Sequence, residues 1–108
     1  MDDNKYNLEF SIITFAGDAK SSAFQAVEYA KKFDFENAEK ILEEAQSSLA
    51  QAHQVQTDMI VKAARGEEVE VNIFLVHAQD HLTAGMTAIE NAKQFIDLYK
   101  QIYELKNK

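Results

Sequence analysis

The stretch from Val71 to Leu105, VNIFLVHAQDHLTAGMTAIENAKQFIDLYKQIYEL, decides the fold, because its apolar residues recur at the spacing of one long helix. They form three rows with a seven-residue repeat. The rows are Leu75, Leu82, Ile89, Ile96 and Tyr103; Phe74, Ala88, Phe95 and Ile102; and Ala78, Gly85, Ala92 and Tyr99. Two other helices of one chain could hardly cover a stripe this wide, so the pattern predicts a helix over about residues 71–105 and favours self-association.

Two more helices precede this stretch, over about residues 6–32 and 35–65, because apolar residues recur there at three- and four-residue steps. The first stripe runs Leu8, Ile12, Phe15, Ala19, Ala23, Ala26, Val27 and Ala30, and the second runs Phe35, Ala38, Ile41, Leu42, Ala45, Leu49, Ala52, Met59, Ile60 and Ala63. Asp34 and Asn72 are suited to begin the helices that follow them, and Gly66 is suited to end the second helix. Gly17 falls inside the first helix, where a kink, a close backbone approach or simple tolerance would explain it.

Composition supports an all-α fold in a single domain, residues 1–108. The chain has 46% hydrophobic residues, three glycines and no proline. This composition favours long helices and supplies few of the turn residues that connect strands. Three long helices with short connections predict an antiparallel up-down-up bundle. A helical hairpin completed by another protein is the alternative.

Charge and cysteine content exclude several classes of function. A formal net charge of −7 argues against nucleic-acid binding and favours a partner with a basic patch. The absence of cysteine excludes disulfides, thiolate metal sites and cysteine catalysis. The first residues are acidic where a signal peptide would be basic, and no apolar run approaches the roughly 20 residues that span a bilayer. We therefore expect a cytoplasmic protein with no direct membrane insertion.

Two of the three histidines and an aspartate lie within little more than one turn of the third helix. His77 and His81 are four residues apart and so stand one above the other, with Asp80 about 60° to the side of His77. His81 falls in the apolar row of Phe74, which also suits a histidine packed at an interface. His77 lies at the margin of the stripe among small residues such as Ala84, which would let another protein surface approach its imidazole closely.

Three chemistries could use this histidine pair. Zinc would need a fourth ligand, and the His-Glu-x-x-His pattern of metalloproteases is absent. A hydrolase would need a nucleophile with its base and orienting group, and the sequence offers no recognisable set. Neutral imidazole can itself attack a phosphoryl group near pH 7 and pass it on, and this third chemistry uses every feature of the segment. His53, among glutamines on the second helix, suits surface or interface packing.

The histidine segment and three others together resemble a known family. The segment Val76-His77-Ala78-Gln79-Asp80-His81-Leu82, the preceding residues 64–71 (ARGEEVEV), the early residues 16–19 (AGDA) and Gln56-Thr57 are similar to the lactose/cellobiose-type enzyme IIA component of the bacterial phosphoenolpyruvate-dependent sugar phosphotransferase system. The likeness covers nearly the whole chain. Phe33 departs from it, since relatives often carry glycine there.

The resemblance implies a function and a set of site residues. His77 would accept a phosphoryl group from the histidine-containing phosphocarrier protein and pass it to a cysteine of the IIB component, with Gln79 and His81 in supporting positions. Asp80 would face the axis of a homotrimer and bind one divalent cation, usually magnesium, together with its two symmetry mates. The sugar stays open, because a IIA component does not touch it. The alternative is a non-catalytic helical interaction module in which the histidines only shape an interface.

Overall fold

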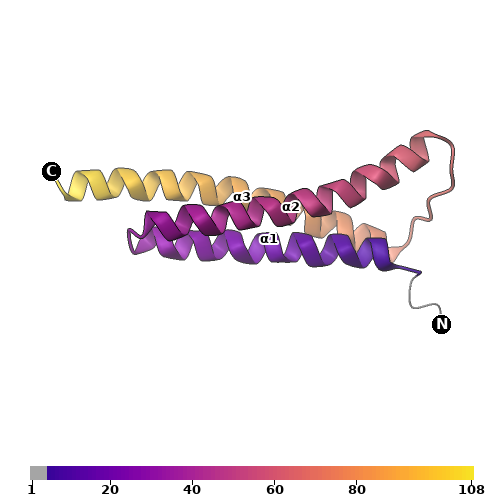
Figure 1. Cartoon of the computed structure of the whole chain (residues 1–108), viewed down its shortest axis with the longest axis horizontal. Coiled ribbons are helices and arrows are strands. Elements are labelled where there is room, and N and C mark those ends of the chain that lie inside the picture. Colours follow the sequence, from indigo (N-terminus) through magenta and orange to yellow (C-terminus); the bar gives the residue numbers. More distant parts are fainter. Residues whose placement is uncertain (1–4) are drawn as a thin grey trace.

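The computed structural model describes residues 5–108, in which all regular secondary structure is helical. The helices are α1 (Asn7–Lys31), α2 (Phe35–Ala64) and α3 (Ile73–Lys106). The chain reverses direction at the short α1–α2 connection and again in residues 65–72, so the helices lie along one another in an elongated bundle of 60 × 28 × 19 Å (Figure 1). The prediction of an all-α fold is confirmed, and each predicted helix end lies within two residues of the observed one.

The predicted helix boundaries have the expected local chemistry. The Asp34 side chain accepts a hydrogen bond from the backbone N–H of Asn37 at 3.3 Å, and the Asn72 side chain accepts one from the N–H of Leu75 at 2.9 Å. Each bond satisfies a donor that a helix start leaves unpaired. Gly66 follows α2 with a φ of +83°, a conformation that favours glycine, so it ends the helix as predicted.

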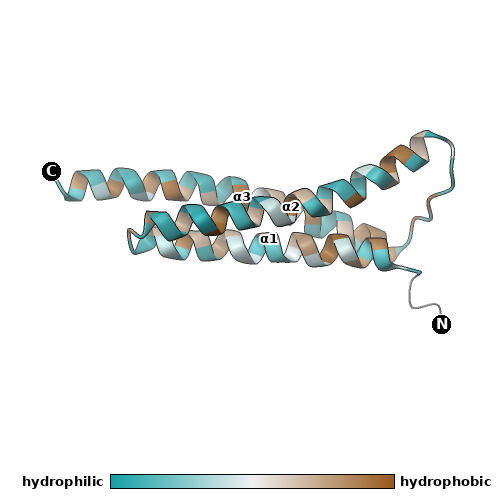
Figure 2. Cartoon of the chain, viewed as in Figure 1, coloured by the Kyte–Doolittle hydropathy of each residue, from teal (hydrophilic) through white to brown (hydrophobic). Residues whose placement is uncertain are grey.

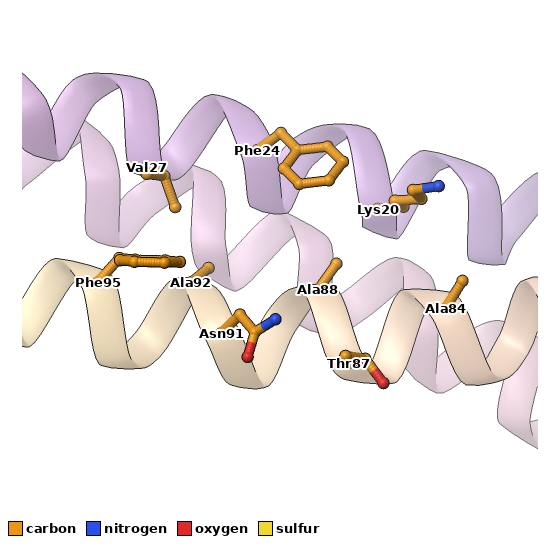
Figure 3. Close-up of a pocket in the computed structure, with 9 residues that line it drawn as sticks. All are labelled: Lys20, Phe24, Val27, Ala84, Thr87, Ala88, Asn91, Ala92 and Phe95. Atoms are coloured by element: carbon orange, nitrogen blue, oxygen red, sulfur yellow. The ribbon is translucent and has the colours of Figure 1, made fainter.

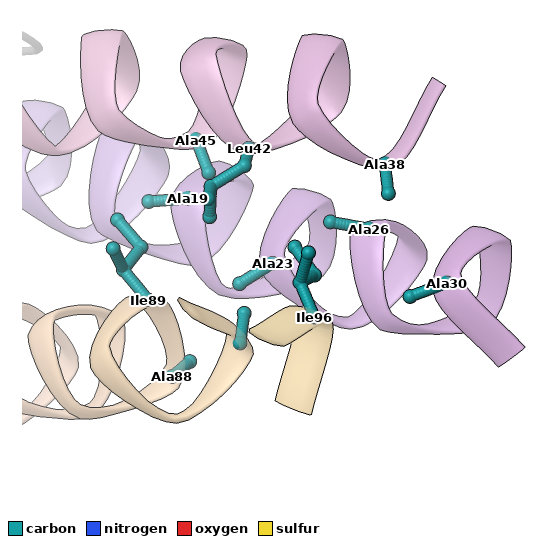
Figure 4. Packing of buried hydrophobic residues seen from close by; sticks show 11 residues of the cluster. Ala19, Ala23, Ala26, Ala30, Ala38, Leu42, Ala45, Ala88, Ile89 and Ile96 are labelled. Atoms are coloured by element: carbon teal, nitrogen blue, oxygen red, sulfur yellow. The ribbon is translucent and has the colours of Figure 1, made fainter. Parts of the chain in front are cut away.

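Small residues on α1 hold the three helices close together. Ala19, Ala23, Ala26 and Ala30 of α1 are fully buried, and larger side chains from the other helices, such as Leu42, pack around them (Figure 4). A second cluster towards the other end of the bundle joins Ile12, Ala16, Ala52, Met59, Ala78 and Leu82. Most of the first predicted row of α3 is therefore buried, and the alanines of α1 make room for it.

Parts of the predicted stripes are exposed, and the arrangement of the helices explains why. Ile60 and Ala63 were expected in the core, but the last turns of α2 diverge from α1 and α3 (Figure 1). Leu8, at the start of α1, is exposed at the same end of the bundle. Phe95, Ile102 and Tyr103 of α3 are also exposed, and Figure 2 shows hydrophobic residues along α3 to its C-terminal end. One chain therefore leaves part of the wide α3 stripe uncovered.

Of the two glycines inside helices, only Gly85 is required by packing. A Cβ atom at Gly85 would lie 3.1 Å from the carbonyl oxygen of Ala16 and 3.3 Å from Cδ1 of Leu49, so this glycine lets α3 approach α1 closely. A Cβ at Gly17 would meet no atom within 4 Å. A close backbone approach at Gly17 is therefore wrong as an explanation, and the close approach belongs to Gly85.

The α1–α2 connection contains a strained residue. Phe33 has a φ of +62°, in the left-handed region that favours glycine. Its ring contacts those of Phe35 and Tyr103, with centroid distances of 6.2 and 5.2 Å, and the ammonium of Lys106 lies 5.5 Å from its centroid. These contacts join the turn to the end of α3. The left-handed backbone also gives a physical reason for the glycine that the family resemblance leads us to expect at this position.

None of the three helices is long and apolar enough to cross a membrane, as judged over residues 5–108.

Candidate functional site

The beginning of α3 brings the two histidines of the predicted site into direct contact. Asn72 fixes where the helix starts, and His77 and His81 follow one turn apart on the same side. Their Nε2 atoms are 3.0 Å apart, and their rings are nearly perpendicular with centroids 4.4 Å apart. Because this distance fits one hydrogen bond, one ring donates a proton and the other accepts it. The hydrogen-bonding role of one ring therefore fixes that of the other.

His77 is exposed and lies beside a hollow of about 420 Å³. The hollow is lined by Ile73, Phe74, Val76, His77 and Asp80. Ile73 and Val76 are 73% and 55% exposed, which is high for apolar residues near a polar site. An imidazole with an exposed apolar wall suits contact with another protein, since covering the wall would exclude water from the ring.

Gln79 connects the site to α2. Its side-chain oxygen accepts a hydrogen bond of 2.7 Å from Nε2 of Gln56, a residue 23 positions earlier in the chain. The predicted supporting role of Gln79 thus involves a partner that the sequence reasoning missed. Gln56 was part of the segment Gln56-Thr57 that carried the resemblance, but no spacing rule relates it to α3.

Asp80 is exposed and lines the same hollow as His77. Among residues 5–108, no group of three histidine or acidic side chains is placed to hold a metal ion. One chain therefore contributes a single carboxylate at this position. His53 is exposed on α2 and does not line the hollow beside His77.

A second hollow, of about 390 Å³, lies farther along α3 in the seam with α1 (Figure 3). Phe24 and Val27 of α1 face Phe95 of α3 across it, and alanines of α3 line it between them. It contains none of the predicted site residues. Ala84, seven residues after His77, lines it, so the two hollows follow the same side of α3.

Comparison with known proteins agrees with this architecture. Residues 7–100 match the family model for the lactose/cellobiose-specific IIA subunit of the phosphotransferase system. The chain is 40% identical over 104 residues to the lichenan-specific phosphotransferase enzyme IIA component of Bacillus subtilis, which covers 96% of this chain and 94% of that protein.

Two solved structures are similar to the whole bundle. The cellobiose-specific enzyme IIA from Bacillus anthracis superposes with a TM-score of 0.91 at 36% identity, covering 96% of this chain and 95% of that one. The IIA(Chitobiose) component in its complex with HPr from the Escherichia coli phosphotransferase system gives a TM-score of 0.77 at 34% identity, covering 90% and 94%. The resemblance seen in the histidine segment therefore extends over sequence and fold, and the chain belongs to the lactose/cellobiose-specific IIA family of the sugar phosphotransferase system.

Proposed function

We propose that this IIA component carries a phosphoryl group on His77. It accepts the group from a histidine-containing phosphocarrier protein and passes it to a cysteine of a IIB component that serves a disaccharide permease. The first partner is supported by the E. coli relative, whose structure was determined as an IIA(Chitobiose)–HPr complex. The relatives named above serve lichenan, cellobiose and chitobiose, so membership of the family does not select one sugar.

One observation carries the proposal: the exposed imidazole of His77 lies in an apolar-walled hollow with a ring nitrogen in contact with His81. A phosphohistidine must survive until its acceptor arrives, so water has to be kept from it. A partner that covers Ile73 and Val76 would do this. The net charge of −7 also favours a partner with basic residues around its own phosphorylated histidine.

The transfer consists of two displacements at phosphorus. In the first, a ring nitrogen of neutral His77 forms a bond to phosphorus while the bond from phosphorus to the donor's histidine nitrogen breaks, and the donor nitrogen recovers its electron pair. In the second, a cysteine thiolate of IIB bonds to phosphorus and the His77 nitrogen recovers its own pair. Each step conserves the phosphoryl group, and neither needs water.

His81 selects which nitrogen of His77 attacks. We assign the donor role to Nε2–H of His81, so that the neutral ring of His77 carries its proton on Nδ1 and has the electron pair on Nε2. This hydrogen bond occupies the pair in the free protein, so it must break before Nε2 attacks phosphorus. Once that nitrogen is bonded to phosphorus, the same N–H can donate to a phosphoryl oxygen, which stabilises the negative charge. Gln79, fixed by Gln56, holds the α2 side of the site.

We further propose that Asp80 lies at the axis of a homotrimer. This residue lies on the exposed side of α3 together with Leu98 and Leu105, exposed apolar residues that a second and third copy would cover. Three copies around an axis would bring three Asp80 carboxylates together, and carboxylate oxygens suit a hard cation such as Mg²⁺. A bound cation would supply the positive charge that offsets their mutual repulsion. We therefore propose a homotrimer with one divalent cation.

The decisive test is phosphorylation by the purified upstream proteins. Wild-type protein, His77→Ala and His53→Ala are incubated with phosphoenolpyruvate, the general transfer enzyme and the phosphocarrier, and intact mass is measured. We expect an acid-labile gain of one phosphoryl group in the wild type and in the matched control His53→Ala, and none in His77→Ala. No gain in the wild type would leave the non-catalytic helical module. An undiminished gain in His77→Ala would refute the assignment of the phosphoryl group to His77.

A further inference from the structure

A small polar cavity at the start of α1 contains a buried carboxylate oxygen that has no hydrogen-bond partner among residues 5–108. Glu9 is only 7% exposed, and its Oε2 atom has no hydrogen-bond partner among the described residues. The cavity has a volume of about 160 Å³ and is lined by Glu9, Lys5 and Leu8 of the N-terminal region, Met59 and Lys62 of α2, and residues 68–70 and 72 of the α2–α3 connection. The phosphoryl chemistry proposed at His77 makes no use of it.

An unpartnered buried carboxylate requires an explanation. Removing such a group from water is unfavourable unless a donor or a cation compensates for it. The ion pairs within residues 5–108 join Lys31, Lys93 and Lys100 to other acids, and neither Lys5 nor Lys62 pairs with Glu9. The volume far exceeds the roughly 30 Å³ that one water molecule occupies in the liquid. Glu9 thus faces space that can hold several water molecules or one group larger than water.

The lining indicates the chemistry of the missing group. Leu8, Met59 and Val69 provide apolar surface, and Glu9, Glu68 and Glu70 provide three carboxylates. An aliphatic stem ending in an ammonium group matches both, because the stem packs on apolar walls while the charged end meets a carboxylate. A bare metal ion matches less well, since the described residues offer no group of three side chains placed to hold one.

We propose that the Glu9 cavity binds a primary alkylammonium group. The group donates a charge-assisted hydrogen bond to Oε2 of Glu9, and its stem lies against Leu8, Met59 and Val69. Such a group has two sources: a free amine, or one of this chain's own lysines, Lys5 or Lys62, which already line the cavity. Occupancy joins α1 to the end of α2 and to the α2–α3 connection, at the end of the bundle where α2 diverges.

The test is a titration of the whole protein with n-butylammonium, followed by ¹H–¹⁵N spectra of the Leu8 and Val69 amides. The variants are Glu9→Gln, which keeps the shape of the side chain but not its charge, and Lys5→Met/Lys62→Met, which removes both internal ammonium groups. Glu67→Gln is the matched control, because it makes the same charge change on an exposed residue that does not line the cavity. Tetramethylammonium controls for charge without an N–H donor.

If a free amine is the occupant, we expect butylammonium to cause saturable chemical-shift changes in the wild type and in Glu67→Gln. Its affinity should be at least about tenfold lower in Glu9→Gln. If an internal lysine is the occupant, butylammonium should bind saturably only to Lys5→Met/Lys62→Met. Adding Glu9→Gln to that variant should abolish the binding. The proposal is overturned if butylammonium saturates in neither background, if Glu9→Gln binds it equally well, or if tetramethylammonium binds as tightly. The tetramethylammonium comparison remains decisive even if Glu9→Gln does not fold.

Discussion

Replacing Phe33 by glycine and, separately, by alanine would measure the strain in the α1–α2 turn. At a φ of +62°, a residue with a Cβ atom costs roughly 1–2 kcal/mol, which glycine avoids. Glycine loses about 0.4–1 kcal/mol of this advantage through the greater freedom of its unfolded chain. We therefore expect Phe33→Gly to be more stable than Phe33→Ala by about 1 kcal/mol. Both variants lose the same ring contacts, so the difference isolates the backbone.

Comparing each variant with the wild type also measures how much the ring contacts of Phe33 stabilise the protein. Phe33→Ala loses the interactions with Phe35, Tyr103 and Lys106 and keeps the strain, so it should be destabilised by about 1–2 kcal/mol. Phe33→Gly loses the same interactions and relieves the strain, so it should lie within about 1 kcal/mol of the wild type. The aromatic contacts and the unfavourable backbone thus nearly offset each other at this turn.

Urea unfolding followed by circular dichroism measures both differences. With a slope of about 2 kcal/mol/M, 1 kcal/mol moves the midpoint by about 0.5 M. Protomer concentration must be the same in every experiment, because self-association would shift the midpoint. The matched control is Gln51, which is exposed in the middle of α2. There the free energy of unfolding should be about 1 kcal/mol higher for Gln51→Ala than for Gln51→Gly. The reasoning would be refuted if Phe33→Ala were as stable as Phe33→Gly. It would also be refuted if the alanine and glycine variants had the same order of stability at positions 33 and 51.

The other predictions concern the site and the helix packing. His81→Ala should slow phosphorylation of His77 by about 10–100-fold without abolishing it, since it removes the N–H proposed to donate to the charged phosphoryl group; a rate equal to wild type in a rapid-quench assay would exclude the proposed donor role. Asp80→Leu should leave a trimer that no longer needs metal, which sedimentation with and without a chelator would check; a wild type that is monomeric at micromolar concentration contradicts the arrangement. Gly85→Val should destabilise the protein by about 1–3 kcal/mol because of the contact with Ala16, whereas Gly17→Ala should stabilise it by up to about 1 kcal/mol; thermal unfolding of the two variants should shift in opposite directions.

Much of the fold could be read from local patterns. The three helices, the capping roles of Asp34 and Asn72 and the glycine at the end of α2 depend on interactions within a few residues, so spacing and residue type were sufficient to predict them. The burial of Ile60 and Ala63 was predicted wrongly, because periodicity shows which face of a helix is apolar but not where the helix leaves its neighbours.

Some features of the candidate site could also be predicted from local spacing, whereas others depend on the tertiary structure. A four-residue spacing already placed His77 and His81 on one side of α3, because helix geometry alone stacks such residues. The hydrogen bond from Gln56 to Gln79 joins residues 23 positions apart, and the carboxylate of Glu9 lines a cavity together with side chains from α2 and the connection after it. The sequence by itself determined the helices, their ends and the histidine pair, since these are local. Only the tertiary structure decided that Gly85 rather than Gly17 permits close packing, and that Oε2 of Glu9 has no hydrogen-bond partner among residues 5–108, because both depend on atoms that distant parts of the chain bring together. The left-handed backbone of Phe33 also became visible only in the structure.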